Sequence, residues 1–135
     1  MAKTTKKNDS KKVVKKKSKS LILSGSIYVQ SSFNNTIISI TDEKGGVISW
    51  ASAGSLGFKG AKKSTPYAAQ LATAQALEKA KARGFAKANI YVSGVGSGRD
   101  SAVRALTNSS IEVSVIKDTT PIAHNGCRPK KPRRV

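Results

Sequence analysis

Most of the positive charge of this 135-residue chain lies at its two ends, which leaves only the middle able to form a folded core. Residues 1–20 hold nine lysines and one aspartate, and residues 119–135 hold five cations and no acid. Such segments bury too little apolar surface to offset the entropy that is lost on ordering. We therefore predict a disordered lysine-rich arm over residues 1–20, one folded domain over residues 21–118, and an extended basic tail over residues 119–135.

The net charge of +18 indicates a polyanionic partner. A small domain needs only about 2–8 charges to stay soluble, so the excess favours nucleic acid first and an anionic membrane surface second. The sequence has no run of about 18 apolar residues and no leader pattern, so we expect neither a membrane span nor a signal peptide. The single cysteine, Cys127, excludes an internal disulfide and fits a reducing, cytosolic setting.

The first half of the middle region has the pattern of three consecutive strands. Residues 21–31 and 36–41 are rich in β-branched side chains and flank a polar turn at residues 32–35, which predicts a β-hairpin. A second turn at residues 42–46 leads into a third strand at residues 47–53. The three strands are expected to form an antiparallel meander.

An alanine-rich helix is predicted over residues 66–83. Thr65 can cap its first turn, Pro66 suits the first helical position, and Gly84 is the expected C-terminal stop. The many alanines make this helix thin enough to lie close to a sheet. Its residue spacing predicts one apolar face, formed by Tyr67, Leu71, Ala74 and Leu77.

The second half of the middle region alternates between strand and helix. We predict strands over residues 89–93 and 111–117, the latter with Ile111, Val113 and Val115 on one face, and a short helix over residues 99–108. The full order is βββαβαβ. This order predicts a single α/β domain with a mixed five-stranded sheet and two helices.

A glycine-flanked loop before the first helix is a candidate RNA contact. Its lysines precede a helix N-terminus, where acids are more usual, and they could bind phosphates while its aromatic ring stacks on a base. We favour this interpretation over a merely solvated loop. The candidate residues are Phe58, Lys59, Lys62, Lys63 and Ser64.

Two other turns each leave two interpretations open. The glycine run at residues 94–98, followed by Arg99, either brings backbone amides and a guanidinium to a phosphate or forms a tight strand-to-helix turn. It lacks the Gly-Lys-Ser/Thr ending of a nucleotide-binding loop. In the hairpin turn that also holds Asn34 and Asn35, Phe33 either caps the core or stacks on a base.

The tail combines three prolines with five cations, which suits an extended segment that threads between RNA helices. His124 and Cys127 are too few for a zinc site, which needs about four ligands, and the tail offers no scaffold for a Cys–His nucleophile. Asn125 and Gly126 are expected to form a turn. The candidate RNA-binding residues of the tail are His124, Asn125, Gly126, Arg128, Lys130, Lys131, Arg133 and Arg134.

The seven acidic residues are scattered, whereas a metal-dependent nuclease needs several carboxylates at one site. We therefore predict no enzymatic activity and no metal or other cofactor. Two alternatives compete with an RNA-binding structural protein. A chromatin-like DNA-binding protein fits the charge but lacks a helix-turn-helix or zinc-finger pattern, and a phosphate-handling enzyme would have to use the glycine run.

Several motifs occur in a fixed order along the chain: residues 32–36 (Ser-Phe-Asn-Asn-Thr), 57–60 with 63–66, 98–100 with 104–106, and 118–121 continuing through 124–129 to 133–135. In these segments the chain resembles the small-subunit ribosomal protein eleven family, bacterial branch. The resemblance implies a ribonuclease-H-like arrangement without nuclease activity, and it adds Arg104 to the RNA-binding candidates. It implies a structural protein of the cytoplasmic ribosome that binds small-subunit rRNA on the platform, near the mRNA exit side and the Shine–Dalgarno cleft.

The same resemblance implies neighbours and contains departures. The implied neighbours are the small-subunit proteins numbered seven, eighteen and twenty-one, with initiation factor three and the mRNA path nearby. Val95 and Ser97 stand where the family usually has prolines, which we expect to leave the glycine run less rigid. Ala123 replaces a usual proline before His124, so the path of the tail is expected to differ locally from that in its relatives.

Overall fold

The computed structural model describes residues 21–134, so the predicted arm at residues 1–20 lies outside the described region. The elements run in the order β1 (Ser24–Ser31), β2 (Thr36–Asp42), β3 (Val47–Ser52), η1 (Gly60–Ser64, a 3₁₀ turn), α1 (Pro66–Lys81), β4 (Lys87–Gly94), α2 (Gly98–Thr107) and β5 (Glu112–Asp118). The predicted βββαβαβ order is confirmed.

All five strands belong to one mixed sheet with the spatial order β3-β2-β1-β4-β5. The meander β1–β2–β3 is antiparallel, whereas β4 pairs in parallel with both β1 and β5. Each parallel neighbour is reached through a helix, as a crossover connection requires. This sheet and its two helices agree with the ribonuclease-H-like arrangement that the resemblance implies.

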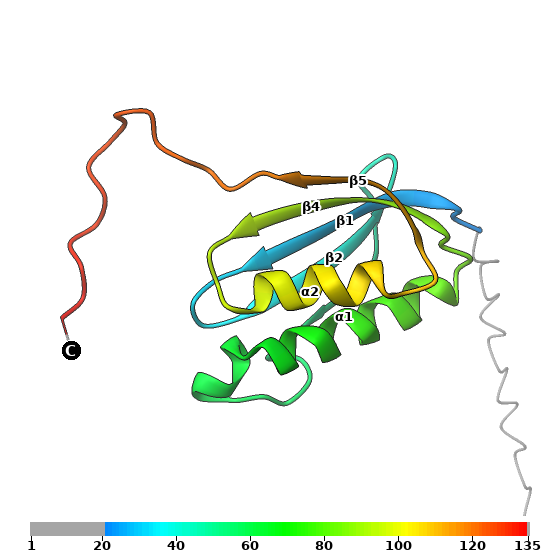
Figure 1. The fold of residues 1–135 in the computed structure, drawn as a ribbon, viewed down its shortest axis with the longest axis horizontal. Coiled ribbons are helices and arrows are strands. Elements are labelled where there is room, and N and C mark those ends of the chain that lie inside the picture. The colour runs from blue at the N-terminus through cyan, green and yellow to red at the C-terminus, as the bar shows by residue number, and fades with distance from the viewer. Residues whose placement is uncertain (1–20, 135) are drawn as a thin grey trace, which may run out of the picture.

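Both helices pack on the same face of the sheet (Figure 1), α1 over β2 and β3 and α2 over β1 and β4. The core between the layers is made of branched side chains from the strands, chiefly Ile27, Val29, Ile38, Ile40 and Ile90, all at most 1% exposed. Within residues 21–134 no element is packed over the other face, where Tyr28 and Trp50 remain 45% and 56% exposed. This second face is called the open face below.

Helix α1 begins at Pro66 as predicted and ends at Lys81, two residues before the predicted end, but its predicted apolar face is wrong. Thr65 Oγ1 accepts a hydrogen bond from the Ala68 N–H at 3.3 Å, and Gly84 adopts a φ of +82° just after the helix. Of the four residues predicted to be buried, only Leu77 is, while Tyr67 is 63% exposed. The sheet instead receives a stripe of small side chains, Ala68, Ala69, Ala72, Thr73, Ala76 and Ala80, because the helix lies too close to it for larger ones.

The predicted single face of strand β5 is also wrong beyond its first half. The pairing of β4 with β5 shifts by one residue between Ala88 and Asn89, so Val113 and Val115 point to opposite faces of the sheet. Such a bulge reverses the alternation of side chains, and sequence alternation alone cannot reveal it. Val115 is therefore 51% exposed. No helix within residues 21–134 is long and apolar enough to cross a membrane.

Candidate nucleic-acid interface

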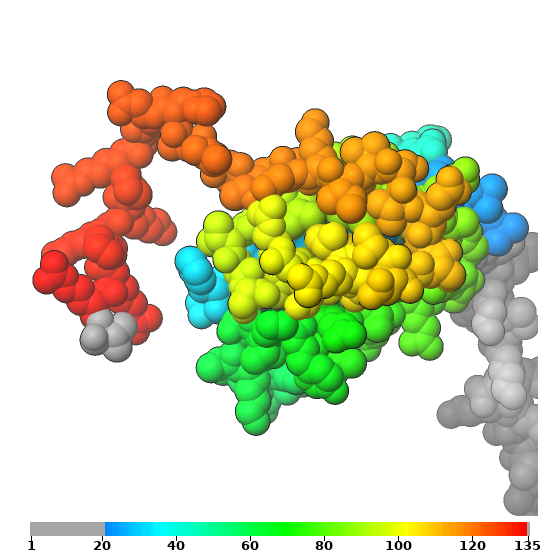
Figure 2. Space-filling view, in the orientation of Figure 1, coloured from blue at the N-terminus to red at the C-terminus, as the bar shows by residue number. Residues whose placement is uncertain are grey.

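The predicted contact segments gather at one end of the domain. Strands β1, β4 and β5 are parallel, so their carboxyl ends share one edge of the sheet. The segments that follow them are the β1–β2 turn (residues 32–35), the β4–α2 turn (residues 95–97) and the start of the tail. Figures 1 and 2 show the η1–α1 segment and the N-terminus of α2 at this same end, from which the tail leaves. We call these segments together the loop end.

Hydrogen bonds join the segments of the loop end to one another. The Gly96 N–H donates to the Ser31 carbonyl at 3.3 Å, and the Ser97 hydroxyl donates to the Ser64 carbonyl at the end of η1. The second hydrogen bond exists because Ser97 stands where the family usually has proline, which has no hydroxyl. We expected Val95 and Ser97 to leave this turn less rigid, and that expectation did not include the hydrogen bond by which Ser97 links the turn to η1. The side chain of Val95 is 64% exposed.

The glycine run forms a tight turn in which the amides of Gly94 and Gly96 bond within the protein. Gly94 has a φ of +98°, and a Cβ built on it would lie 1.9 Å from the Ser31 carbonyl oxygen. The Gly94 N–H donates to Thr120 Oγ1 at 3.2 Å, and the Gly96 N–H is also bonded internally. The structure thus favours the tight-turn interpretation of this run over a backbone cradle for phosphate.

Arg99 ties the glycine turn to the beginning of the tail. Its Nη1 donates to the Gly94 carbonyl at 2.9 Å and to Thr120 Oγ1 at 3.2 Å, while its Nη2 donates to Asp118 Oδ2 at 2.7 Å. Asp118 Oδ1 in turn accepts from the Thr120 N–H at 2.9 Å and from the Thr120 hydroxyl at 2.6 Å. We call this group of Arg99, Asp118 and Thr120 the tail clasp.

The tail clasp keeps Asp118 ionised. Hydrogen bonds from Arg99 and then from Thr120 hold the pKa of this carboxyl far below its ordinary value of 3.8. A depressed folded pKa means that the contribution of Asp118 to stability is complete above pH 3.8. It is lost only as the pH falls towards the depressed value, so the clasp persists through neutral and weakly acidic conditions. Sequence reasoning left a phosphate contact through Arg99 as one of two open interpretations, and it gave Asp118 and Thr120 no individual role.

The change Asp118→Asn tests whether the clasp positions the tail. Because it removes a negative charge, simple electrostatics predicts stronger binding to a polyanion. We expect the reverse: the amides of Thr119 and Thr120 exchange hydrogen faster, and affinity for small-subunit rRNA falls about 3- to 10-fold, as for one lost charge-assisted hydrogen bond. Glu78→Gln, the same charge change at an exposed site in the second half of α1, away from the loop end, should leave affinity unchanged or slightly higher. Equal behaviour of the two variants would contradict a positioning role.

The β1–β2 turn presents Phe33 to solvent on a rigid backbone. Ser32 and Asn35 close the turn through the Ser32 N–H donating to the Asn35 carbonyl at 2.9 Å and the Asn35 N–H donating to Ser32 Oγ at 3.1 Å. Phe33 is 75% exposed, so it does not cap the core, and base stacking is the alternative that remains. Asn34 is exposed beside it, whereas Asn35 Oδ1 accepts from the Thr36 N–H at 2.9 Å.

The glycine-flanked loop of residues 58–64, called the lysine loop below, ends in the η1 turn and leads directly into α1. Lys59 and Lys62 are exposed, Lys63 and Ser64 are half-buried, and the first turn of α1 carries no acid. Phe58 meets Tyr67 edge-to-face, with 6.3 Å between the ring centroids. Sequence reasoning placed Tyr67 on the apolar face of the helix, yet its position in the first turn after a basic loop could have marked it as a surface aromatic.

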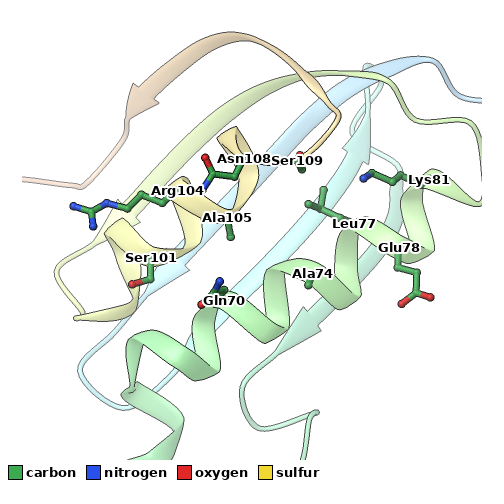
Figure 3. Close-up of a pocket in the computed structure, with 10 residues that line it drawn as sticks. All are labelled: Gln70, Ala74, Leu77, Glu78, Lys81, Ser101, Arg104, Ala105, Asn108 and Ser109. Atoms are coloured by element: carbon green, nitrogen blue, oxygen red, sulfur yellow. The ribbon is translucent and has the colours of Figure 1, made fainter.

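Arg104 is the one candidate within the folded domain that lies apart from the loop end. It sits in the last turn of α2 and borders a hollow of about 670 Å³ between α1 and α2, which Gln70, Leu77 and Asn108 also line. Figure 3 shows its guanidinium pointing outward from this hollow. The sequence could not separate Arg104 from Arg99, because the two residues belong to the same motif, residues 98–100 with 104–106.

The tail leaves the clasp as an exposed, extended segment (Figure 1), in agreement with its composition. Asn125 adopts a φ of +60° at a bend, so the predicted Asn125–Gly126 turn is present. From residue 121 to residue 134 every side chain is exposed, including those of His124 and the five cations. The cations of the tail are thus free of ion pairs with residues 21–134.

A family model described as ribosomal protein S11 matches residues 25–134, which is more than three quarters of the chain. The chain belongs to the ribosomal protein S11 family. The match runs from the start of β1 to the end of the described tail, so the sheet, the loop end and the tail are all part of the S11 pattern. The lysine-rich residues before β1 lie outside it.

Curated S11 relatives match the chain over nearly its whole length. A protein of Solibacter usitatus (strain Ellin6076) named small ribosomal subunit protein uS11 is 55% identical over 135 residues, the whole of both chains. The uS11 of Sulfurovum sp. (strain NBC37-1) is 56% identical over 124 residues, 91% of this chain and all of that protein. The uS11 of Desulfovibrio desulfuricans (strain ATCC 27774) is 54% identical over 125 residues, 93% and 97% of the two chains.

Proposed function

We propose that this protein is a structural constituent of the small ribosomal subunit and binds small-subunit rRNA through the loop end and the tail. The observation that carries the proposal is the convergence of exposed cations and aromatic rings on one end of the domain. Lys59, Lys62 and Phe33 are all exposed on segments of this end, and the five-cation tail starts from the same end. Ribosomal structural proteins are not a class of enzymes, so the proposed role is architectural.

The parts of this interface have different tasks. The lysines and the tail cations neutralise phosphates, which supplies affinity without reading sequence. Phe33 and Phe58 offer ring faces or edges for unstacked bases, the usual targets of specific RNA recognition. Arg99 acts as a positioning residue, because its guanidinium donates hydrogen bonds to Asp118 and Thr120. The rigid clasp fixes where the tail leaves the domain.

The finer location follows the family resemblance. We propose a site on the platform of the small subunit, near the mRNA exit side and the Shine–Dalgarno cleft. The proposed neighbours are the small-subunit proteins numbered seven, eighteen and twenty-one, with initiation factor three and the mRNA path close by. The protein would then reside in the ribosome of the cytoplasm.

Co-sedimentation in a sucrose gradient tests the proposal. The tagged full-length chain should travel with small subunits through moderate salt, and protein that stays at the top of the gradient would contradict the function. Binding to duplex DNA as tight as to small-subunit rRNA at the same salt would instead favour a general nucleic-acid-binding protein.

A triple variant, Lys59→Gln with Lys62→Gln and Lys63→Gln, tests the loop end. We expect about 10- to 100-fold weaker rRNA binding at 0.1 M salt, because up to three phosphate contacts are lost. The matched control replaces three exposed lysines elsewhere on the domain, Lys44, Lys79 and Lys81, with glutamine. It changes net charge equally, so an equal loss in both variants would show that only total charge matters.

A further inference from the structure

The open face of the sheet carries a row of side chains that the interface above does not use. The strand register places Trp50 on β3 opposite Ser39 on β2, Ser39 opposite Tyr28 on β1, Tyr28 opposite Tyr91 on β4, and Tyr91 opposite Lys117 on β5. The row thus crosses the whole sheet at right angles to its strands. We call these five residues the aromatic row.

Part of the ring surface in the aromatic row is exposed to solvent. Tyr28 and Tyr91 stack on each other, with 5.2 Å between their centroids and 17° between their planes. One face of Tyr28 is therefore covered by Tyr91, yet Tyr28 remains 45% exposed. Ser39 is small, and beyond it Trp50 is 56% exposed. Strands two apart lie about 9.5 Å from each other, which leaves space over Ser39 for a flat ring.

The surroundings of the row suit a nucleotide. Next to Tyr91 the open face is hollowed by about 470 Å³, and hydroxyl and amide groups of Ser26, Asn89 and Ser114 line this hollow. Its charged lining groups are one carboxylate, Glu43, and one amine, Lys87, so it favours a base or a ribose over a phosphate. At the β5 end of the row, opposite Tyr91, Lys117 is exposed, and the basic tail begins two residues later at Thr119.

We infer that the aromatic row binds unpaired RNA nucleotides, with a base stacked on Tyr28 and Trp50 and the backbone led along Lys117 towards the tail. The inference rests on the proposed RNA-binding function and adds a second contact surface to it. Sheets that bind single-stranded RNA stack bases on exposed aromatic side chains in this way, and stacking tolerates different bases because each has a flat π face. A protein partner is the competing occupant, and the experiment separates the two.

Trp50 is the only tryptophan in the sequence, so its fluorescence reports on the aromatic row alone. The probes are a 20-nucleotide single-stranded RNA of mixed sequence and the same RNA annealed to its complement, with RNA binding followed separately by anisotropy of an end label. We expect the single strand to quench Trp50 emission as it binds. The duplex should bind through the basic chain ends and the loop end while leaving the emission of Trp50 unchanged.

Variants of Tyr28 give an independent measurement. Tyr28→Ala should weaken single-strand binding about 5- to 150-fold for one lost stacking contact, with an unchanged salt slope because stacking releases no counterions. Tyr28→Phe keeps the ring and should bind as the original chain does. Leu71→Ala, which shortens an exposed apolar side chain on the helix side, should have no effect.

The failures of the two proposals are distinguishable. Single-stranded RNA that binds without quenching Trp50 would overturn the aromatic row as a base site while leaving the RNA-binding function in place. No binding of either RNA would overturn the function itself. Trp50 emission that changes only when purified small-subunit proteins are added without RNA, or when the chain alone is concentrated, would assign the row to a protein interface and also overturn the inference.

Discussion

Replacing Gly94 with alanine is expected to destabilise the domain by more than about 3 kcal/mol, a large share of the roughly 5–15 kcal/mol typical of a domain. Two costs act together at this position. The φ of +98° is unfavourable for any residue with a Cβ, and the added Cβ would lie 1.9 Å from the Ser31 carbonyl oxygen. The β1–β2 turn or the end of β4 must therefore move. Urea unfolding followed by circular dichroism measures the change.

Gly45 provides a matched control for the Gly94 variant. It also has a positive φ, +87°, but apart from its two neighbours in the chain nothing lies within 4 Å of the position that an added Cβ would take. Gly45→Ala should therefore cost only about 1 kcal/mol, from backbone strain alone. The difference between the two variants isolates the close approach of the glycine turn to β1. Equal losses would mean that this approach yields easily and does not hold the loop end together.

The order of elements could be predicted because each has a local cause. Thr65 and Pro66 begin α1, Gly84 follows its end, and β-branched alternation marks the strands that carry Ile27, Ile38 and Ile90. Which face of α1 is buried could not be predicted from the size of its apolar side chains. A helix that lies flat on a sheet needs small residues at the contact, so its alanines were buried and its larger Tyr67 was left outside.

The candidate site was predictable as a set of segments but not as a geometry. Charge and glycine content marked the lysine loop, the glycine run and the tail, and the parallel arrangement of β1, β4 and β5 brings their ends together. Arg99 was among the predicted RNA-binding candidates, but its partners within the protein could not be foreseen. Asp118 is 19 residues away in the chain, and only the pairing of β4 with β5 places it beside the guanidinium.

The aromatic row shows the same limit for contacts across strands. Alternation along β1 and β4 puts Tyr28 and Tyr91 on the side away from the buried Ile27 and Ile90. It does not say that the two rings meet, because that depends on a register that pairs Tyr28 with Tyr91. A bulge of the kind found between β4 and β5 would have moved one ring to another row.

Deleting residues 126–135 is expected to cause the largest loss of rRNA affinity, about 10²- to 10⁴-fold at 0.1 M salt. The deletion removes Arg128, Lys130, Lys131, Arg133 and Arg134 and leaves the tail clasp intact. Each phosphate contact contributes about 0.9 to the slope of log affinity against log salt on duplex DNA and about 0.7 on single strands. Five lost contacts should therefore reduce that slope by up to about 3.5–4.5.

The full-length chain with all five of these cations changed to glutamine separates charge from chain length. If the tail acts by neutralising phosphates, this variant should lose as much affinity and slope as the deletion does. A smaller loss would assign part of the binding to the backbone and prolines of the tail. Both variants should unfold at the same urea concentration as the original chain, because the side chains of residues 121–134 are all exposed and add nothing to the core. An unchanged salt slope in both would show that the tail is not an RNA contact, and binding would then rest on the loop end and the remaining basic residues.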